Sequence, residues 1–143
     1  MTTIYFDMDG TIANLYGVNG WLADLHDENP RPYKEAKPLI NFSIFAKTLH
    51  KVQKKGYRIG IITWLSKNST EAYDMAVADT KRRWLKKHLP SVTWDEIHIL
   101  KYGTPKSTCG NGILFDDEKP NREDWKGTAY NVDNIIETLK ALA

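Results

Sequence analysis

The chain has 143 residues, a hydrophobic content of 41% and five tryptophans, which predicts a globular domain and argues against a disordered chain. Its formal net charge of +2 is too small to indicate nucleic acid or a membrane surface as the partner. Cys109 is the single cysteine, and no apolar run approaches membrane-spanning length. With no secretory leader expected ahead of the first strand, we predict a soluble, cytoplasmic protein.

The expected elements alternate between strands and helices. Residues 4–6 have the apolar, β-branched and aromatic make-up of a short buried strand. Residues 14–37 are irregular and contain two glycines and two prolines, with room for one short amphipathic helix around Trp21, Leu22 and Leu25. The remaining pattern predicts, in chain order, a helix capped by Asn41 and ended by Gly56, a strand at 59–63, a helix at 69–88, strands at 97–100, 112–115 and 128–131, and a final helix carrying Val132, Ile135, Leu139 and Leu142.

This alternation predicts the α/β class, with a Rossmann-like parallel sheet of about five strands and helices on both faces. We expect residues 1–143 to form a single domain, in which residues 14–37 make a minimal cap or lid after the first strand. In such sheets, ligands bind outside the carboxyl ends of the strands.

Polar side chains lie at those ends. Asp7, Thr63 and the pair Asp116 and Asp117 each lie at the end of a predicted strand, and Lys106 lies in the loop after another. The sequence therefore predicts that these side chains converge on one edge of the sheet.

The residue types at this edge suit phosphoryl transfer. The Asp7 carboxylate can attack phosphorus and form an aspartyl phosphate. Asp9 can protonate the leaving oxygen and later activate water. The Thr63 hydroxyl and the backbone N–H groups of the turn after Asp7 can hold the phosphoryl oxygens, and Lys106 supplies positive charge, although Lys101 competes for that role.

Four carboxylates form the expected metal site, namely those of Asp7, Asp9, Asp116 and Asp117. Carboxylates packed this closely repel one another, and a divalent cation relieves the repulsion. Mg²⁺ is the expected ion because it prefers carboxylates, water and phosphate oxygens. Asp117 is either a direct ligand in place of Asp116 or a group that orients its neighbours.

In this order the motifs resemble those of the haloacid-dehalogenase (HAD) superfamily of phosphohydrolases, over nearly the whole chain. Residues 7–11 (DMDGT) resemble its first motif, residues 61–63 (IIT) its second, Lys106 its third and residues 114–117 (LFDD) its fourth. The resemblance implies that Asp7 is the nucleophile and Asp9 the acid/base. An aspartate at position 9 favours a phosphatase over a dehalogenase or phosphonatase.

Within that superfamily the chain is most similar to the 5'(3')-deoxyribonucleotidase-like group. The similarity rests on residues 7–10, on the helical stretch 81–90 and on Asp116–Asp117 followed by Pro120 and Asn121. Two departures are a cap shorter than usual and the residues after Thr63, which are Trp64, Leu65 and Ser66 in place of a small residue and proline.

Aromatic and basic residues suggest what the site binds. Four aromatic side chains could stack on a planar group, or pack within the core or lid: Tyr16, Trp21, Tyr33 and Trp64. We take Thr11, Trp64 and Lys106 as candidate substrate-binding residues. The basic run at 81–88 is interpreted as a solvated helix face, with Trp84 and Leu85 on the buried side; a phosphate-rich partner is the alternative.

We therefore expect a Mg²⁺-dependent phosphomonoesterase acting on a small phosphorylated metabolite, with nucleoside monophosphates first among the candidates. One alternative is a phosphatase of nucleic-acid 3' ends. Another is a receiver-like module that stores phosphate on an aspartate, but no aspartate ends the strand at 59–63, where a receiver would carry it. No membrane partner is expected, and both a monomer and a homodimer are compatible with the sequence.

Overall fold

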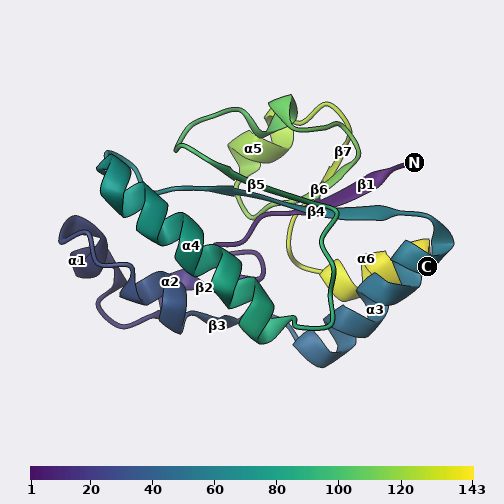
Figure 1. Ribbon diagram of the computed structural model, residues 1–143. Coiled ribbons are helices and arrows are strands. Elements are labelled where there is room, and N and C mark those ends of the chain that lie inside the picture. The colour runs from purple at the N-terminus through teal and green to yellow at the C-terminus, as the bar shows by residue number, and fades with distance from the viewer.

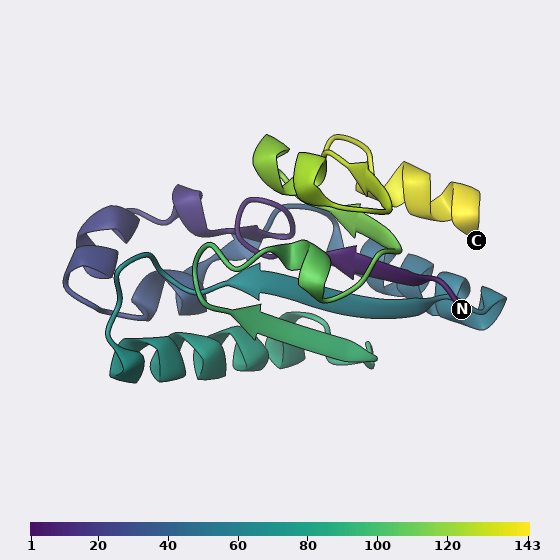
Figure 2. The ribbon, with the colours of Figure 1, turned by 90° about the horizontal axis from the view of Figure 1, so that it is seen from above.

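A computed structural model describes residues 1–143 and confirms the predicted α/β class. Five parallel strands form one sheet in the order β5-β4-β1-β6-β7. In Figure 2 the strands lie side by side, and the arrows of β1, β4 and β5 point toward the end of the molecule that carries the segment after β1. The strands are β1 (Thr3–Phe6), β4 (Arg58–Trp64), β5 (Glu96–Leu100), β6 (Ile113–Phe115) and β7 (Thr128–Tyr130).

Helices cover both faces of the sheet (Figure 1). On one face lie α3 (Phe42–Lys55), α4 (Glu71–His88) and α6 (Ile135–Leu142), and on the other lies the short α5 (Lys119–Asp124), which was not predicted. The predicted ends of α3 are confirmed, because the Asn41 side chain accepts a hydrogen bond from the backbone N–H of Ile44 and Gly56 adopts a φ of 114°. None of the helices has the length and apolar character needed to cross a bilayer.

The segment between β1 and α3 is more regular than the sequence suggests. It contains η1 (Leu15–Gly17), the expected helix α1 (Trp21–His26) and a second helix, α2 (Arg31–Glu35). A two-stranded antiparallel pair, β2 (Ala13–Asn14) with β3 (Lys37–Pro38), closes its base. Pro30 and Pro32 argued against α2, but they lie at its start, where a helix needs no backbone N–H donor.

Hydrogen bonds join this segment to α4 and to the loop before α4. The Glu28 carboxylate accepts hydrogen bonds from the backbone N–H (2.8 Å) and hydroxyl (2.7 Å) of Thr70, the N-cap of α4. The Tyr33 hydroxyl lies 2.6 Å from the Ser66 hydroxyl. The Trp84 indole N–H donates to the backbone carbonyl of Ala36 at 2.8 Å. These bonds hold the segment over the carboxyl ends of the strands.

The main core lies between the sheet and helices α3, α4 and α6. Phe6, at the end of the central strand β1, is fully buried, stacks on Phe115 with ring centroids 5.2 Å apart and packs edge-on against Phe45. Dense packing around Phe6 fixes the position of the next residue, Asp7.

We expect Leu49→Ala to lower the free energy of unfolding by about 2–5 kcal/mol, because Leu49 of α3 is fully buried and its loss leaves a cavity. Ile44→Ala on the same helix is the matched control, since Ile44 is 40% exposed, and it should change stability by no more than about 0.5 kcal/mol. Urea denaturation followed by circular dichroism measures both. Equal losses would show that α3 does not pack on the sheet as described.

Candidate active site

The loop after β1 curls tightly so that Asp7 enters the site. The Asp7 backbone N–H donates to the Phe115 carbonyl at 2.9 Å, which continues the pairing of β1 with β6. The backbone N–H groups of residues 11–13 then all donate to the Met8 carbonyl. Gly10 has a φ of 81°, and a Cβ there would lie 2.4 Å from the Asp117 carboxylate. This turn therefore requires glycine.

Lys106 joins two strand ends. It begins η2 (Lys106–Thr108), is 3% exposed, and donates to Asp7 Oδ1 at 2.8 Å and to Asp116 Oδ2 at 2.7 Å. Burial alone would lower the pKa of its ammonium, but the two carboxylates outweigh burial and raise it. Lys101, the competing candidate, has an exposed side chain. Of the two lysines considered in the sequence, Lys106 is the one that contacts the acids.

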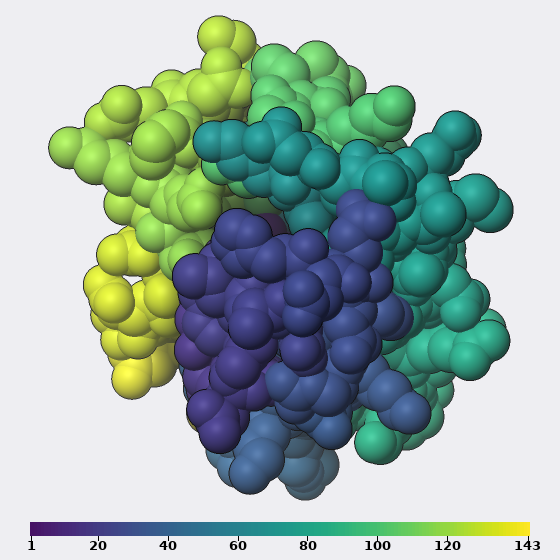
Figure 3. Space-filling view, turned by 90° about the vertical axis from the view of Figure 1, so that its left-hand side faces the viewer, coloured from purple at the N-terminus to yellow at the C-terminus, as the bar shows by residue number.

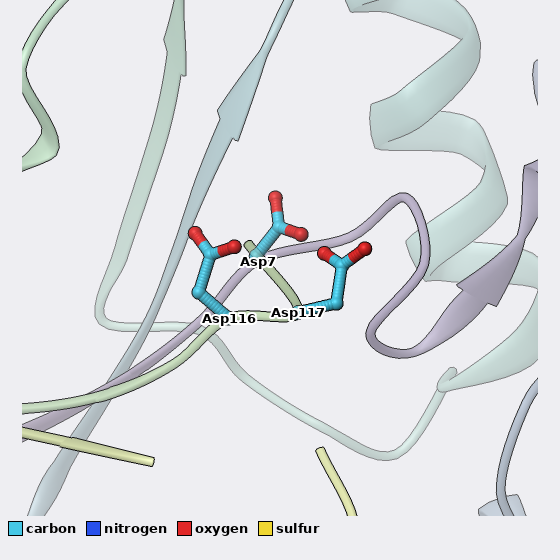
Figure 4. Close-up of side chains that lie close together, drawn as sticks. All are labelled: Asp7, Asp116 and Asp117. Carbon is cyan, nitrogen blue, oxygen red and sulfur yellow. The ribbon is translucent and has the colours of Figure 1, made fainter. Parts of the chain in front are cut away.

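Asp7, Asp116 and Asp117 form a compact acidic group, in which one carboxylate oxygen of each lies within 4.8 Å of the others. Figure 4 shows the three side chains rising on the same side of the loops after β1 and β6. Burial, followed by repulsion from Asp7, raises the pKa of Asp116 to about 6 and that of Asp117 to about 7. These three carboxylates repel one another and offer only oxygen atoms as ligands. Such a group fits a hard divalent cation such as Mg²⁺.

Backbone and side-chain donors fix these carboxylates. The backbone N–H of Glu118 donates to Asp116 Oδ1 at 2.9 Å. The Thr11 hydroxyl donates to Asp7 Oδ2 at 2.9 Å and lies 3.3 Å from Asp117 Oδ1. Thr11, a candidate for substrate binding, uses its single hydroxyl proton in the bond to Asp7. Its position suits orienting Asp7.

The Asp9 carboxylate is outside this acidic group and pairs with a different lysine. Lys81 of α4 donates to Asp9 Oδ2 at 2.9 Å. Burial is the largest influence on Asp9 and raises its pKa, while the charge of Lys81 acts in the opposite direction. The two aspartates of the DMDGT stretch thus occupy distinct surroundings although one residue separates them.

The interpretation of the basic run at 81–88 as a solvated helix face is wrong for its first member. Lys81 is 1% exposed, and its ammonium also donates to Thr63 Oγ1 at 2.6 Å. The signal was present in the sequence, because Lys81 precedes Trp84 by three residues and Leu85 by four and so shares their buried face. Thr63 itself is fully buried and is the last residue but one of β4, close to the predicted strand end.

A cavity of about 230 Å³ opens next to Asp7, Asp9, Lys106 and Asp116. Figure 3 looks onto this face and shows a dark hollow between the purple-blue segment after β1, the teal loop that precedes α4 and the green region of α5. All four aromatic residues singled out in the sequence line the cavity, and Tyr102, which was not, joins them; the five are Tyr16, Trp21, Tyr33, Trp64 and Tyr102.

The aromatic walls are held in pairs. Tyr16 packs edge-on against Trp21 with ring centroids 5.0 Å apart, and Trp64 lies 5.1 Å from Tyr102. The Trp64 indole N–H donates to the Thr104 carbonyl at 2.8 Å, and the Lys106 ammonium lies 5.5 Å from the centre of a Trp64 ring. The aromatic pair of Trp64 and Tyr102 thus lies next to the Lys106 ammonium.

Comparison with models of protein families gives no match, and comparison with curated protein sequences gives none. Among solved structures, the chain is similar to the crystal structure of D,D-heptose 1,7-bisphosphate phosphatase from Burkholderia thailandensis, with a TM-score of 0.55 and 11% sequence identity. The match covers 99% of this chain and 97% of that chain. At this identity the likeness shows that the two proteins share a fold across almost their whole lengths.

Proposed function

We propose that this chain is a Mg²⁺-dependent phosphomonoesterase of the HAD superfamily that works through an aspartyl phosphate. The observation that carries the proposal is the buried Lys106 bridge between Asp7 and Asp116, with Asp117 beside it and the separately paired Asp9 at the same cavity. The order of motifs in the sequence supports it, and so does a fold shared with a phosphatase.

In the first step, an oxygen of Asp7 forms a bond to phosphorus while the bond from phosphorus to the ester oxygen breaks. Lys106 and the Thr11 hydroxyl each hold one oxygen of Asp7, so the nucleophile is presented in a fixed orientation. Asp9, whose burial favours its protonated form, gives its proton to the departing oxygen, and the alcohol leaves uncharged.

In the second step, the Asp9 carboxylate takes a proton from water, whose oxygen attacks phosphorus and frees Asp7. Inorganic phosphate is released and both aspartates return to their starting states. Because the same carboxyl group gives and then takes one proton, the cycle balances without another acid or base.

Asp7, Asp116 and Asp117 are the side chains that would hold Mg²⁺, with Asp9, the fourth expected ligand, pointing to Lys81 instead. When bound, the ion would supply positive charge beside the phosphoryl oxygens. Lys106 alone offers one positive charge against the three carboxylates of the group, so the chain's own residues leave a deficit that a cation fills.

The cavity supports a small substrate with a planar, apolar leaving group, and we propose a nucleoside monophosphate. Trp21 and Tyr16 from residues 14–37, acting as the lid, would stack on a base, and Trp64 and Tyr102 would border the same cavity. This would place the chain in the 5'(3')-deoxyribonucleotidase-like group.

Asp7→Asn should abolish phosphate release, reducing kcat by about 10⁴-fold or more, because an amide cannot form the acyl phosphate. Asp27→Asn, which changes an exposed aspartate, is the matched control and should retain wild-type turnover. A screen of nucleotides, sugar phosphates and 3'-phosphorylated oligonucleotides, each with MgCl₂ or EDTA, measures this. Equal turnover in EDTA would refute the metal requirement, and a preference for the oligonucleotides would favour an end-processing enzyme.

Mg²⁺ should raise the melting temperature more at about pH 8 than at about pH 5. The pKa values of Asp116 and Asp117 are raised to about 6 and about 7 from an ordinary value near 4. The folded, metal-free protein therefore binds more protons than the unfolded chain between about pH 4 and pH 7. The contribution of these two groups to the free energy of unfolding is lost as pH rises through that window.

Because protons compete with the cation for the same oxygens, acid should weaken the effect of Mg²⁺. Thermal melts with MgCl₂ or EDTA test this. Asp117→Asn should flatten the pH dependence, whereas Asp27→Asn should preserve it. A melting temperature indifferent to Mg²⁺ at both pH values would contradict the metal assignment.

Trp21→Ala should raise KM for a nucleoside monophosphate by about 5- to 100-fold, as expected for the loss of one base-stacking contact. The KM for glycerol phosphate, which has no ring to stack, should stay within about twofold. Leu22→Ala is the control from the same helix, because Leu22 is 53% exposed. Equal KM changes for both substrates would rule out a stacking role.

A further inference from the structure

We propose that Lys81 is a positioning residue that holds the Asp9 carboxylate and the Thr63 hydroxyl in their working orientations. This inference rests on the proposed function, since it assigns a role within the same site. It goes beyond that function because Lys81 lies on α4, eighteen residues after Thr63, and takes no part in binding the metal group or in the nucleophilic attack.

The Lys81 ammonium is fully used. A lysine has three N–H donors, and Lys81 directs its Nζ to Asp9 Oδ2 at 2.9 Å, Thr63 Oγ1 at 2.6 Å and the Trp64 backbone carbonyl at 2.8 Å. The ring of Tyr33 covers it, with its centre 5.1 Å from Nζ. Three acceptors from two chain segments thus meet at one buried point, and no water is needed to complete it.

For Asp9, the bond to Lys81 selects one oxygen. Oδ2 is held by the ammonium, whereas no protein group donates to Oδ1. Asp9 also lines the cavity. The free oxygen is therefore available for the proton that passes to the leaving group, and the bond to Lys81 limits rotation of the carboxylate away from it.

For Thr63, the bond to Lys81 sets the polarity of the hydroxyl. An ammonium has no lone pair, so Lys81 must donate and Thr63 Oγ1 must accept. The single hydroxyl proton of Thr63 is then directed away from Lys81, which is the polarity that a hydroxyl needs in order to donate to an anionic oxygen. One buried side chain thereby orients two groups of the site.

The test compares leaving groups, because a positioning role through Asp9 matters only where the departing oxygen needs a proton. We would measure kcat/KM, which covers the steps up to release of the alcohol, for phenyl phosphate and for 2,4-dinitrophenyl phosphate. Lys81→Met should reduce kcat/KM for phenyl phosphate by about 10²-fold or more. For the dinitrophenyl ester, whose leaving group departs without protonation, the reduction should stay below about fivefold, the remainder reflecting Thr63.

Three further variants make the comparison specific. Lys86→Met on the exposed face of the same helix should leave both substrates unaffected. Lys81→Arg keeps the charge and should recover part of the loss with phenyl phosphate. Adding Lys81→Met to Asp9→Asn should cause little further loss with that ester, because the two residues act through one group.

The outcomes separate the two proposals. If the wild-type chain hydrolyses neither ester and none of the phosphates in the screen, or if Asp7→Asn hydrolyses both esters, the proposed function fails and the role of Lys81 fails with it. If the wild-type chain is active but Lys81→Met lowers kcat/KM equally for both esters, or for neither, only the assignment of Lys81 is overturned. Should Lys81→Met not fold, as judged by circular dichroism, Lys81→Arg is compared in the same way, and an equal loss for both esters overturns the assignment.

Discussion

The site depends on a single buried ammonium between two carboxylates that come from different strands. Asp7 follows β1 and Asp116 follows β6, and both are almost completely buried. Two such anions would repel one another strongly in a medium of low polarity. Lys106, itself buried, donates to both at 2.8 and 2.7 Å and so makes their approach favourable. Removing one member would leave the others with unpaired buried charge, which costs more than the pair contributes.

A second buried lysine divides the acids of the site into two groups with different chemistry. Lys106 lies among Asp7 and Asp116, where negative charge accumulates and a cation fits. Lys81, which lies on α4, forms its ion pair with Asp9. Neighbouring carboxyl groups take on separate tasks when their surroundings differ. Although a single residue separates them in the sequence, Asp7 and Asp9 are hydrogen-bonded to different lysines, which suits a nucleophile and a proton donor.

The sequence predicted the strand ends better than the helix faces, for a physical reason. Strands of a parallel sheet bring their carboxyl ends to one edge whatever their neighbours are, so the meeting of Asp7 and Asp116 followed from topology. Lys106 lies in the loop after β5 and was singled out by its charge and by the order of motifs. Lys81 was missed because a run of basic residues is usually solvated. The charge of this run favoured a solvated face, although helical spacing places Lys81 beside Trp84 and Leu85. The place of Tyr102 in the cavity wall depends on the path of the loop after β5, which no periodic pattern encodes. The helix α2 was missed because its prolines resemble a loop signal.

The way in which residues 14–37 are held determines what kind of site this is. A mobile cap would close over a substrate and exclude water only when the substrate is bound. Here Glu28, Tyr33 and Ala36 are each hydrogen-bonded to the α4 region, and Tyr33 also covers the Lys81 ammonium. The aromatic walls are thereby formed before a substrate arrives. A preformed pocket loses little conformational entropy on binding, but it can accept only ligands that fit the existing space. Residues 14–37 contribute Tyr16, Trp21 and Tyr33 to the cavity wall, and Tyr33 also covers the lysine that holds Asp9.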